Sequence, residues 1–140
     1  MSASVETWDR PVPVTDPFSK EYFAAWADQR LIVQHCPACG HWQHYPRAIC
    51  VQCGATPVFE EQEAVGQVYT FTIVRQMGNA PFKQEVPFAV ASVSLACGVK
   101  ILATVVDCEP EDVHIGMEVE GFAVIAADGI GVPYWRPRRQ

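Results

Sequence analysis

The chain has 140 residues, enough for one domain of ordinary size or for two small domains that share an interface. Its formal net charge is −6 at pH 7, so its surface repels polyanions overall, which argues against a general nucleic-acid-binding protein. No apolar run reaches the roughly 18 to 20 residues of a membrane span, and residues 1–10 lack the basic and apolar regions of a signal peptide. We therefore expect a soluble, cytoplasmic protein.

The N-terminal region, residues 1–30, is predicted to form an extended arm followed by a short helix. Pro11-Val12-Pro13 excludes a helix from the arm. Asp16 and Pro17 are typical of a helix start, with Asp16 as N-cap and Pro17 at the first helical position. We expect this helix to end near Asp28.

The predicted helix carries an aromatic face, because four aromatic residues recur at helical spacing: Phe18, Tyr22, Phe23 and Trp26. Two interpretations of this face remain open. In the first, it packs on the rest of the chain as part of the core. In the second, part of it stays exposed and covers a ligand or contacts a partner protein.

Residues 31–60 contain two Cys-x-x-Cys-Gly turns, formed by Cys36 and Cys39 and by Cys50 and Cys53. Each turn brings two sulfurs to one side of the backbone, and four thiolates complete a tetrahedron around Zn²⁺ with Zn–S distances of about 2.3 Å. A catalytic zinc keeps one coordination position for water or substrate. Because four cysteines fill the site, we predict a structural zinc.

Other uses of the four cysteines are less favoured. A rubredoxin-type iron site has the same two turns, but its electron-transfer role usually occupies a dedicated small domain. Disulfides are disfavoured because thiols stay reduced in the cytosol. His35, His41 and His44 flank the turns as alternative ligands, but the four cysteines suffice, and we expect these histidines to be surface or neighbouring residues.

Short strands at residues 31–34 and 58–60 and an extended link at residues 45–47 are expected to complete a rubredoxin-like zinc ribbon. The segment is too short to form a hydrophobic core of its own, so metal binding must contribute to its folding. Arg47 is its only strong base, whereas a nucleic-acid-binding ribbon normally displays several.

From residue 66 onward the hydrophobic pattern alternates with a period of two, which predicts β-strands at residues 68–74, 88–95, 99–106, 118–126 and 131–135. The third of these strands is nearly all apolar or small, which predicts burial of both its faces. Residues 77–82 are expected to form an irregular loop, and residues 110–113 a single helical turn. Five short strands with one longer break fit a closed OB-fold barrel at residues 61–140, with a plain β-sandwich as the alternative.

The order of these parts resembles the DUF35 family. The resemblance rests on Asp-Pro-Phe at residues 16–18, Cys-Pro-Ala-Cys-Gly at 36–40, Tyr-Pro-Arg at 45–47, Gly-Gln-Val-Tyr-Thr-Phe-Thr at 66–72, and Ile-Gly-Met at 115–117. It covers nearly the whole chain from Asp16 to Pro137. It implies a mainly β protein with a short N-terminal helix, a zinc ribbon and a C-terminal OB-fold.

The resemblance also implies a function in acyl-CoA metabolism, including that of lipids or steroids. Several family members are partner subunits of thiolase-like enzymes, hydratases or aldolases that act on CoA thioesters, and the partner carries the nucleophile. We therefore expect an accessory, non-catalytic subunit of a hetero-oligomer. The sequence supports no nucleophile–base pair. We expect structural roles for Cys97, Cys108 and His114. The alternative function is a nucleic-acid-binding zinc-ribbon and OB-fold module.

A site for a CoA thioester requires cations beside apolar walls, because CoA joins phosphates to an apolar pantetheine tail. The cations with aromatic neighbours are Arg47, Arg75, Lys83 and the basic tail at residues 136–139, which follows Trp135. The candidate CoA contacts are therefore Arg47, Arg75, Lys83 and Trp135.

The substitution Cys36→Ser tests the structural role of the metal. We expect it to abolish stoichiometric zinc binding, unfold the ribbon and release any partner subunit, because three thiolates cannot close the site. Cys97→Ser is the matched control and should leave zinc content and elution volume unchanged. Metal analysis and gel filtration of both variants decide the matter, and a Cys36→Ser protein that keeps one zinc would contradict a four-cysteine site.

Overall fold

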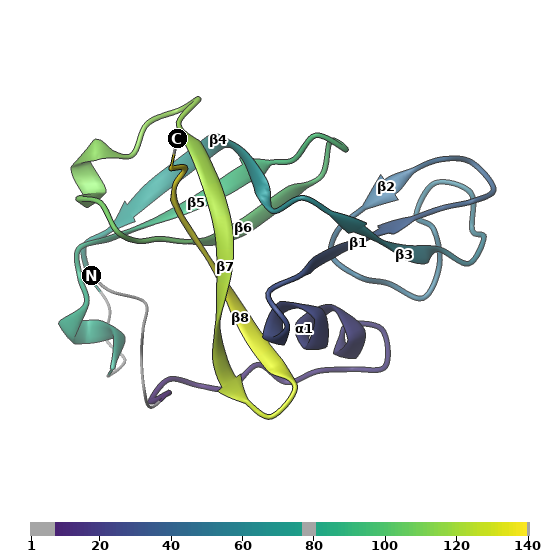
Figure 1. Ribbon diagram of the computed structural model, residues 1–140, viewed down its shortest axis with the longest axis horizontal. Helices are drawn as coiled ribbons and strands as arrows, with labels where there is room; N and C mark the ends of the chain where they lie inside the picture. Colours follow the sequence, from purple (N-terminus) through teal and green to yellow (C-terminus); the bar gives the residue numbers. More distant parts are fainter. Residues whose placement is uncertain (1–7, 77–80, 140) are drawn as a thin grey trace.

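The computed structural model describes residues 8–76 and 81–139, so four residues of the predicted loop at 77–82 lie outside the described residues. The chain forms a helix, a three-stranded sheet and a five-stranded closed barrel, which confirms the predicted fold class and excludes the sandwich (Figure 1). In chain order the elements are α1 (Lys20–Ala27), β1 (Leu31–His35), β2 (Trp42–Gln43), β3 (Val58–Gln62), β4 (Val65–Val74), η1 (Phe82–Gln84), β5 (Phe88–Ser94), β6 (Lys100–Val105), η2 (Pro110–Asp112), β7 (Glu118–Ala127) and β8 (Ile130–Pro137).

Helix α1 begins later than predicted. Asp16 Oδ1 accepts hydrogen bonds from the backbone N–H groups of Phe18 and Ser19, and Ser19 Oγ accepts one from the Asp16 N–H. Asp16 therefore caps a preceding turn, and Ser19 is the N-cap of the helix. The helix ends at Ala27, close to the predicted end.

The aromatic face of α1 is mostly core, which supports the first of the two interpretations that the sequence left open. Tyr22, Phe23 and Trp26 are only 2%, 9% and 1% exposed, because they pack against the ribbon strands and the barrel. Phe18 alone remains 44% exposed. The first interpretation of the face, packing on the rest of the chain, is the one that the structure supports.

Helix α1 approaches the barrel closely at Gly131 of β8. A Cβ atom at Gly131 would lie 2.4 Å from the backbone nitrogen of Ala27 and 2.5 Å from the carbonyl carbon of Trp26. The absence of a side chain therefore sets the distance between helix and strand. At the end of the helix, the Gln29 side chain donates to the Ala123 carbonyl and accepts from the Ala123 N–H, which ties the helix to β7.

The ribbon sheet has strand order β2-β1-β3, and all its pairings are antiparallel. Leu31, Ile32 and Val33 of β1 are buried in the same hydrophobic cluster as α1 and the barrel. The base of the ribbon thus shares the main core, and only its tip projects away from the body of the protein (Figure 1). Strand β3 extends to Gln62, two residues beyond the predicted ribbon boundary at residue 60.

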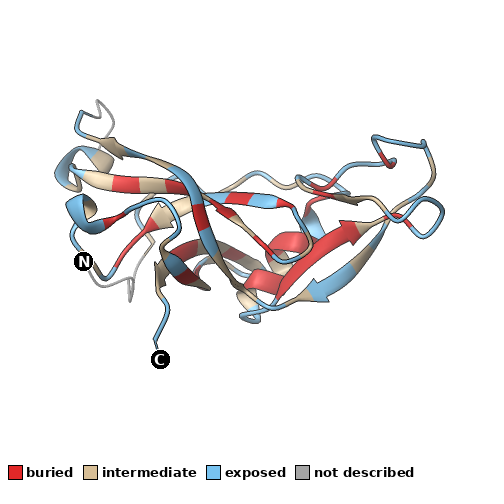
Figure 2. Ribbon diagram, turned by 90° about the horizontal axis from the view of Figure 1, so that it is seen from above, coloured by how far each residue is buried: buried red, intermediate tan, exposed pale blue. Residues whose placement is uncertain are grey.

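The barrel closes in the order β4-β5-β6-β8-β7. Buried and partly buried positions alternate along β5 (Figure 2). The prediction that the third barrel strand is buried on both faces is wrong: in β6, Ile101 is 1% exposed but Leu102 is 65% exposed. The reason is that a barrel strand directs alternate residues inward and outward, whatever their hydrophobicity. The predicted helical turn is confirmed as η2.

Within the described residues, no helix combines the length and the apolarity needed to cross a membrane.

The substitution Gly131→Ala tests the close contact between α1 and β8. We expect a loss of about 1 to 3 kcal/mol of unfolding free energy, because the new Cβ meets backbone atoms that have no rotamer to escape into. Gly129→Asn is the control, since Gly129 sits at φ +74° with open space around its Cβ position, and Asn tolerates that conformation. Urea denaturation measures both variants, and equal stabilities would contradict the packing argument.

Candidate functional site

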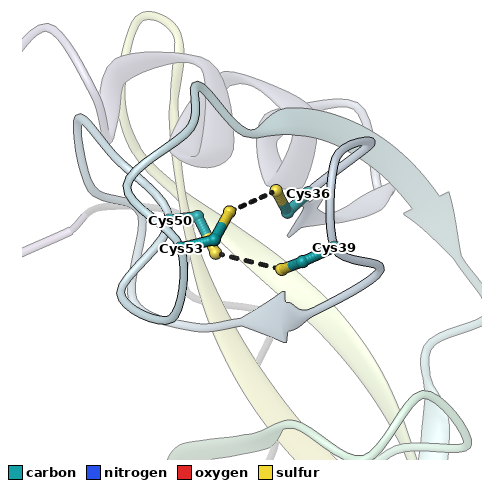
Figure 3. Close-up of side chains that lie close together, drawn as sticks. All are labelled: Cys36, Cys39, Cys50 and Cys53. Atoms are coloured by element: carbon teal, nitrogen blue, oxygen red, sulfur yellow. Dashed lines mark hydrogen bonds between the residues drawn. The ribbon is translucent and has the colours of Figure 1, made fainter.

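The four cysteines of the two turns converge on one point at the tip of the ribbon (Figure 3). Their sulfurs all lie within 4.8 Å of one another, with Cys36 Sγ 3.5 Å from Cys53 Sγ and Cys39 Sγ 3.7 Å from Cys50 Sγ. Tetrahedral zinc with Zn–S distances near 2.3 Å requires sulfur–sulfur distances of about 3.8 Å. The donor set and its spacing therefore fit a structural zinc ion.

The two cysteine turns have the same backbone geometry. The N–H of Gly40 donates to the Cys36 carbonyl at 2.8 Å, and the N–H of Gly54 donates to the Cys50 carbonyl at 2.9 Å. Both glycines adopt positive φ, +81° and +83°, which a glycine accepts without strain. Hydrogen bonding from the backbone N–H of Cys39 lowers the pKa of Cys36. In Cys39 the backbone N–H of His41 lowers the pKa less than burial and the neighbouring sulfurs raise it, to about 12.

Two buried glutamines fix the link between the cysteine turns. Gln43 Nε2 donates to Gln34 Oε1 at 2.8 Å, and Gln34 in turn binds both the N–H and the carbonyl of Arg47. Gln43 also accepts from the Val51 N–H. These bonds satisfy the amide groups of the two buried glutamine side chains, and so they position the link that carries Arg47.

A groove of about 620 Å³ lies where the arm, α1, the ribbon link and the barrel meet. This volume is within the range of small-molecule and cofactor pockets. Aromatic and aliphatic residues form much of its wall: Trp8, Tyr22, Phe23, Tyr45, Phe82, Leu102, Val132, Pro133 and Tyr134. Three cations, Arg10, Arg47 and Lys100, also line it.

The groove is positively charged within an acidic protein. Among the described residues that line it, none is Asp or Glu, although the chain carries 16 acidic residues. Arg10 pairs with Glu85 and Asp9, so much of its charge is compensated. Neither Arg47 nor Lys100 forms an ion pair with another described residue. Lys100 Nζ lies 4.5 Å from the centroid of the Tyr69 ring, a contact that leaves its positive charge uncompensated by an acidic group. The charges of both residues are therefore available to an anionic ligand.

Burial changes the protonation of two groups in the wall of the groove. Desolvation and, to a lesser extent, Arg47 lower the pKa of His44 from 6.5 to about 4, so this imidazole is neutral at pH 7. Desolvation also raises the pKa of Tyr22 to about 12. The rings of the two residues lie 5.0 Å apart, centroid to centroid, and hold the link against α1.

The four predicted CoA contacts lie in different parts of the structure, and only one of them lines the groove. Arg47 lines the groove. Arg75, at the end of β4, and Lys83, in η1, are exposed and lie outside the groove. Trp135 does not fit its predicted role: it is 0% exposed, and its indole N–H donates to the Ile101 carbonyl, so the ring belongs to the barrel core.

Sequence reasoning missed Lys100 and Arg10. Lys100 begins β6, and Arg10 lies in the arm, about 90 residues earlier in the chain. Nothing local marks either residue as a partner of Arg47, because only the closure of the barrel and the path of the arm bring them together. Phe82, the aromatic neighbour on which the prediction of Lys83 rests, lines the groove, whereas Lys83 itself does not.

The described fold and metal site define a zinc-ribbon and OB-fold protein. Family models agree with this description: residues 23–58 match the rubredoxin-like zinc ribbon domain of ChsH2, and residues 60–124 match the C-terminal OB-fold domain of ChsH2. A DUF35 domain-containing scaffold protein of Methanocaldococcus jannaschii is 38% identical over 102 residues, 71% of this chain and 72% of that protein. The chain belongs to the ChsH2/DUF35 family.

Two further relatives are described as an enzyme or an enzyme subunit, and a third is a DUF35 protein of unknown function. The solved structure of an Ltp2-ChsH2(DUF35) aldolase contains a chain with 29% identity and a TM-score of 0.79, covering 89% of this chain and 98% of that one. A probable enoyl-CoA hydratase alpha subunit of Thermomonospora curvata is 30% identical over 91% of this chain, which spans only 40% of that protein. A DUF35 protein of Sulfolobus solfataricus shares the fold at 16% identity, with a TM-score of 0.61.

The lowered pKa of His44 predicts a pH dependence of stability. An unfolded histidine takes up a proton below about pH 6.5, whereas His44 in the folded protein stays neutral until about pH 4. The free energy of unfolding should therefore fall as the pH drops through this window, by at most about 3 kcal/mol. The contribution of His44 is fully present above pH 6.5 and is lost towards pH 4.

The variant His44→Gln isolates this effect from acid release of zinc, which affects both proteins alike. We expect the difference in unfolding free energy between wild type and variant to shrink as the pH falls from 7 to 4.5. Chemical denaturation at several pH values measures it. Parallel stability curves for the two proteins would show that His44 titrates normally.

Proposed function

We propose that this protein is an accessory, non-catalytic subunit of a cytoplasmic enzyme that acts on CoA thioesters, and that the groove contributes to binding the CoA group. The observation that carries the proposal is the composition of the groove: apolar and aromatic walls with Arg47 and Lys100, and no acidic residue among the described lining. An anionic ligand with an apolar tail fits such walls.

The relatives support a partner enzyme. One is described as part of an Ltp2-ChsH2(DUF35) aldolase, one as a hydratase subunit and another as a scaffold protein. This chain matches one chain of that aldolase structure over 98% of the matched chain's length. We infer from this that the chain is an aldolase-, hydratase- or thiolase-binding module, and that the partner carries the reacting groups.

The remaining candidate nucleophiles lie outside the groove, which supports an accessory subunit whose partner carries the reacting groups. Burial raises the pKa of the Cys108 thiol most, and the negative charge of the nearby Asp112 raises it further. A raised pKa lowers the reactivity of the thiol at neutral pH. Cys97 lies in the turn after β5, and His114 Nδ1 lies 3.0 Å from the Asp112 carbonyl oxygen. None of the three lines the groove.

A nucleic-acid-binding function has one observation in its favour. The groove includes part of the β5–β6 face of the barrel, which is the face that OB-folds use to bind oligonucleotides, and it combines cations with aromatic rings. Against it stand the net charge of −6 and the small number of unpaired cations along the groove. We therefore prefer the CoA thioester.

Purification of the tagged protein from its own host tests the accessory role. We expect a stoichiometric thiolase-like, hydratase-like or aldolase-like subunit, identified by mass spectrometry, whose activity on CoA thioesters falls at least tenfold when this chain is removed and returns when it is added back. The Cys36→Ser variant serves as the folding control and should capture nothing. Recovery of nucleic acid, or of an enzyme whose activity is independent of this chain, would overturn the proposal.

A further inference from the structure

Strands β6 and β8 pair over a very short distance. Their parallel register joins Thr104 to Tyr134 and Val105 to Trp135, and the Val106 N–H donates to the Trp135 carbonyl at 2.8 Å. β6 begins at Lys100, yet its first half has no pairing with β8 among the described residues. The two strands therefore separate towards the groove, which both of them line.

Pro133 explains where this pairing stops. Backbone groups of a strand point to alternate sides, so Pro133, two residues before Trp135, also directs its backbone nitrogen towards β6. Strand β7 is consistent with this direction. Ala123 of β7 lies opposite Pro133, and its N–H and carbonyl bond to Gln29 and not to β8. Proline has no N–H, so the next hydrogen bond of the ladder cannot form.

The acceptor that lacks this bond is the carbonyl of Leu102. Leu102 lies four residues before Val106, so its backbone N–H and carbonyl face the same side, towards β8. No hydrogen bond to either group occurs among the described residues apart from the strand ladders, and the ladder to β8 ends at Thr104. The edge of β6 at Lys100 and Leu102 is thus open, and it forms part of the groove wall.

We propose that this open edge of β6 binds the pantetheine arm of a CoA thioester through the two amide groups of that arm. The inference rests on the proposed function and adds to it the element that holds the ligand. An amide-bearing chain can pair with the edge as an added strand does, with alternating donors and acceptors. Lys100 and Arg47 then lie within the same groove to bind the phosphates, and the aromatic walls cover the apolar parts.

The substitution Pro133→Val tests the proposal, because it supplies the missing N–H and lets β8 pair with Leu102. We expect the affinity of the zinc-loaded full-length protein for acetyl-CoA to fall about tenfold, the effect of losing one or two hydrogen bonds. Thermal stability should stay the same or rise. Isothermal titration calorimetry measures the affinity, and circular dichroism measures the melting temperature.

Pro137→Val is the matched control. Pro137 lies on the same strand four residues further along, so its backbone nitrogen faces the same side, but it is outside the groove. We expect this variant to bind acetyl-CoA like the wild type. Lys100→Gln should also weaken binding, and its effect should shrink in high salt, because a phosphate contact is screened.

Each other outcome overturns the inference in a recognisable way. If Pro133→Val binds acetyl-CoA as tightly as the wild type, CoA does not use the β6 edge, although the accessory role can still hold. If the wild type does not bind acetyl-CoA but Pro133→Val loses capture of the partner enzyme, the edge binds an extended segment of that enzyme. If neither activity is present in the wild type, the proposed function fails as well.

Discussion

The tetrahedral arrangement of four cysteine sulfurs is the constraint on which the ribbon tip depends. Between Cys36 and Gly54 the only buried residues are two of the cysteines themselves, Gln43 and Pro46. Such a segment cannot balance its loss of conformational entropy by apolar burial, so metal binding must supply the difference. The metal and the Gln34–Gln43 pair together fix the link, and the link carries Arg47 to the groove. A structural metal thus helps to determine the position of a groove cation that it does not touch.

The groove is a composite of parts that are far apart in sequence. Tyr22 and Phe23 come from α1, Arg47 from the ribbon and Lys100 from the barrel, and the packing of Gly131 against α1 sets the distance between helix and barrel. The buried base of the ribbon joins the same core. Because the groove lacks acidic side chains among its described lining while the protein is acidic overall, it attracts anions to one place and not to the surface in general. This is the behaviour expected of a site for a phosphate-bearing small molecule.

The features that follow from local sequence were predictable. The cysteine spacing identified the metal site, and the period of two identified the barrel strands, because both signals lie within a few residues. The failures concern long-range geometry. Leu102 is apolar yet exposed, since barrel closure decides which side of β6 faces inward, and Trp135 is buried although it adjoins a basic tail. The meeting of Arg47 with Lys100 and the missing hydrogen bond at Pro133 depend on which strands become neighbours, which no local pattern specifies.

In the proposed function, the ribbon link and the barrel edge form one ligand site that the metal holds in place. Two-dimensional amide NMR of the isotopically labelled protein tests it most directly, by titration of acetyl-CoA into the zinc-loaded and the zinc-stripped forms. We expect the signals of the link around Arg47 and of β6 around Leu102 to shift together, with one affinity, and only in the zinc-loaded form. Shifts confined to one of the two segments, shifts elsewhere on the protein, or equal binding after zinc removal would contradict it.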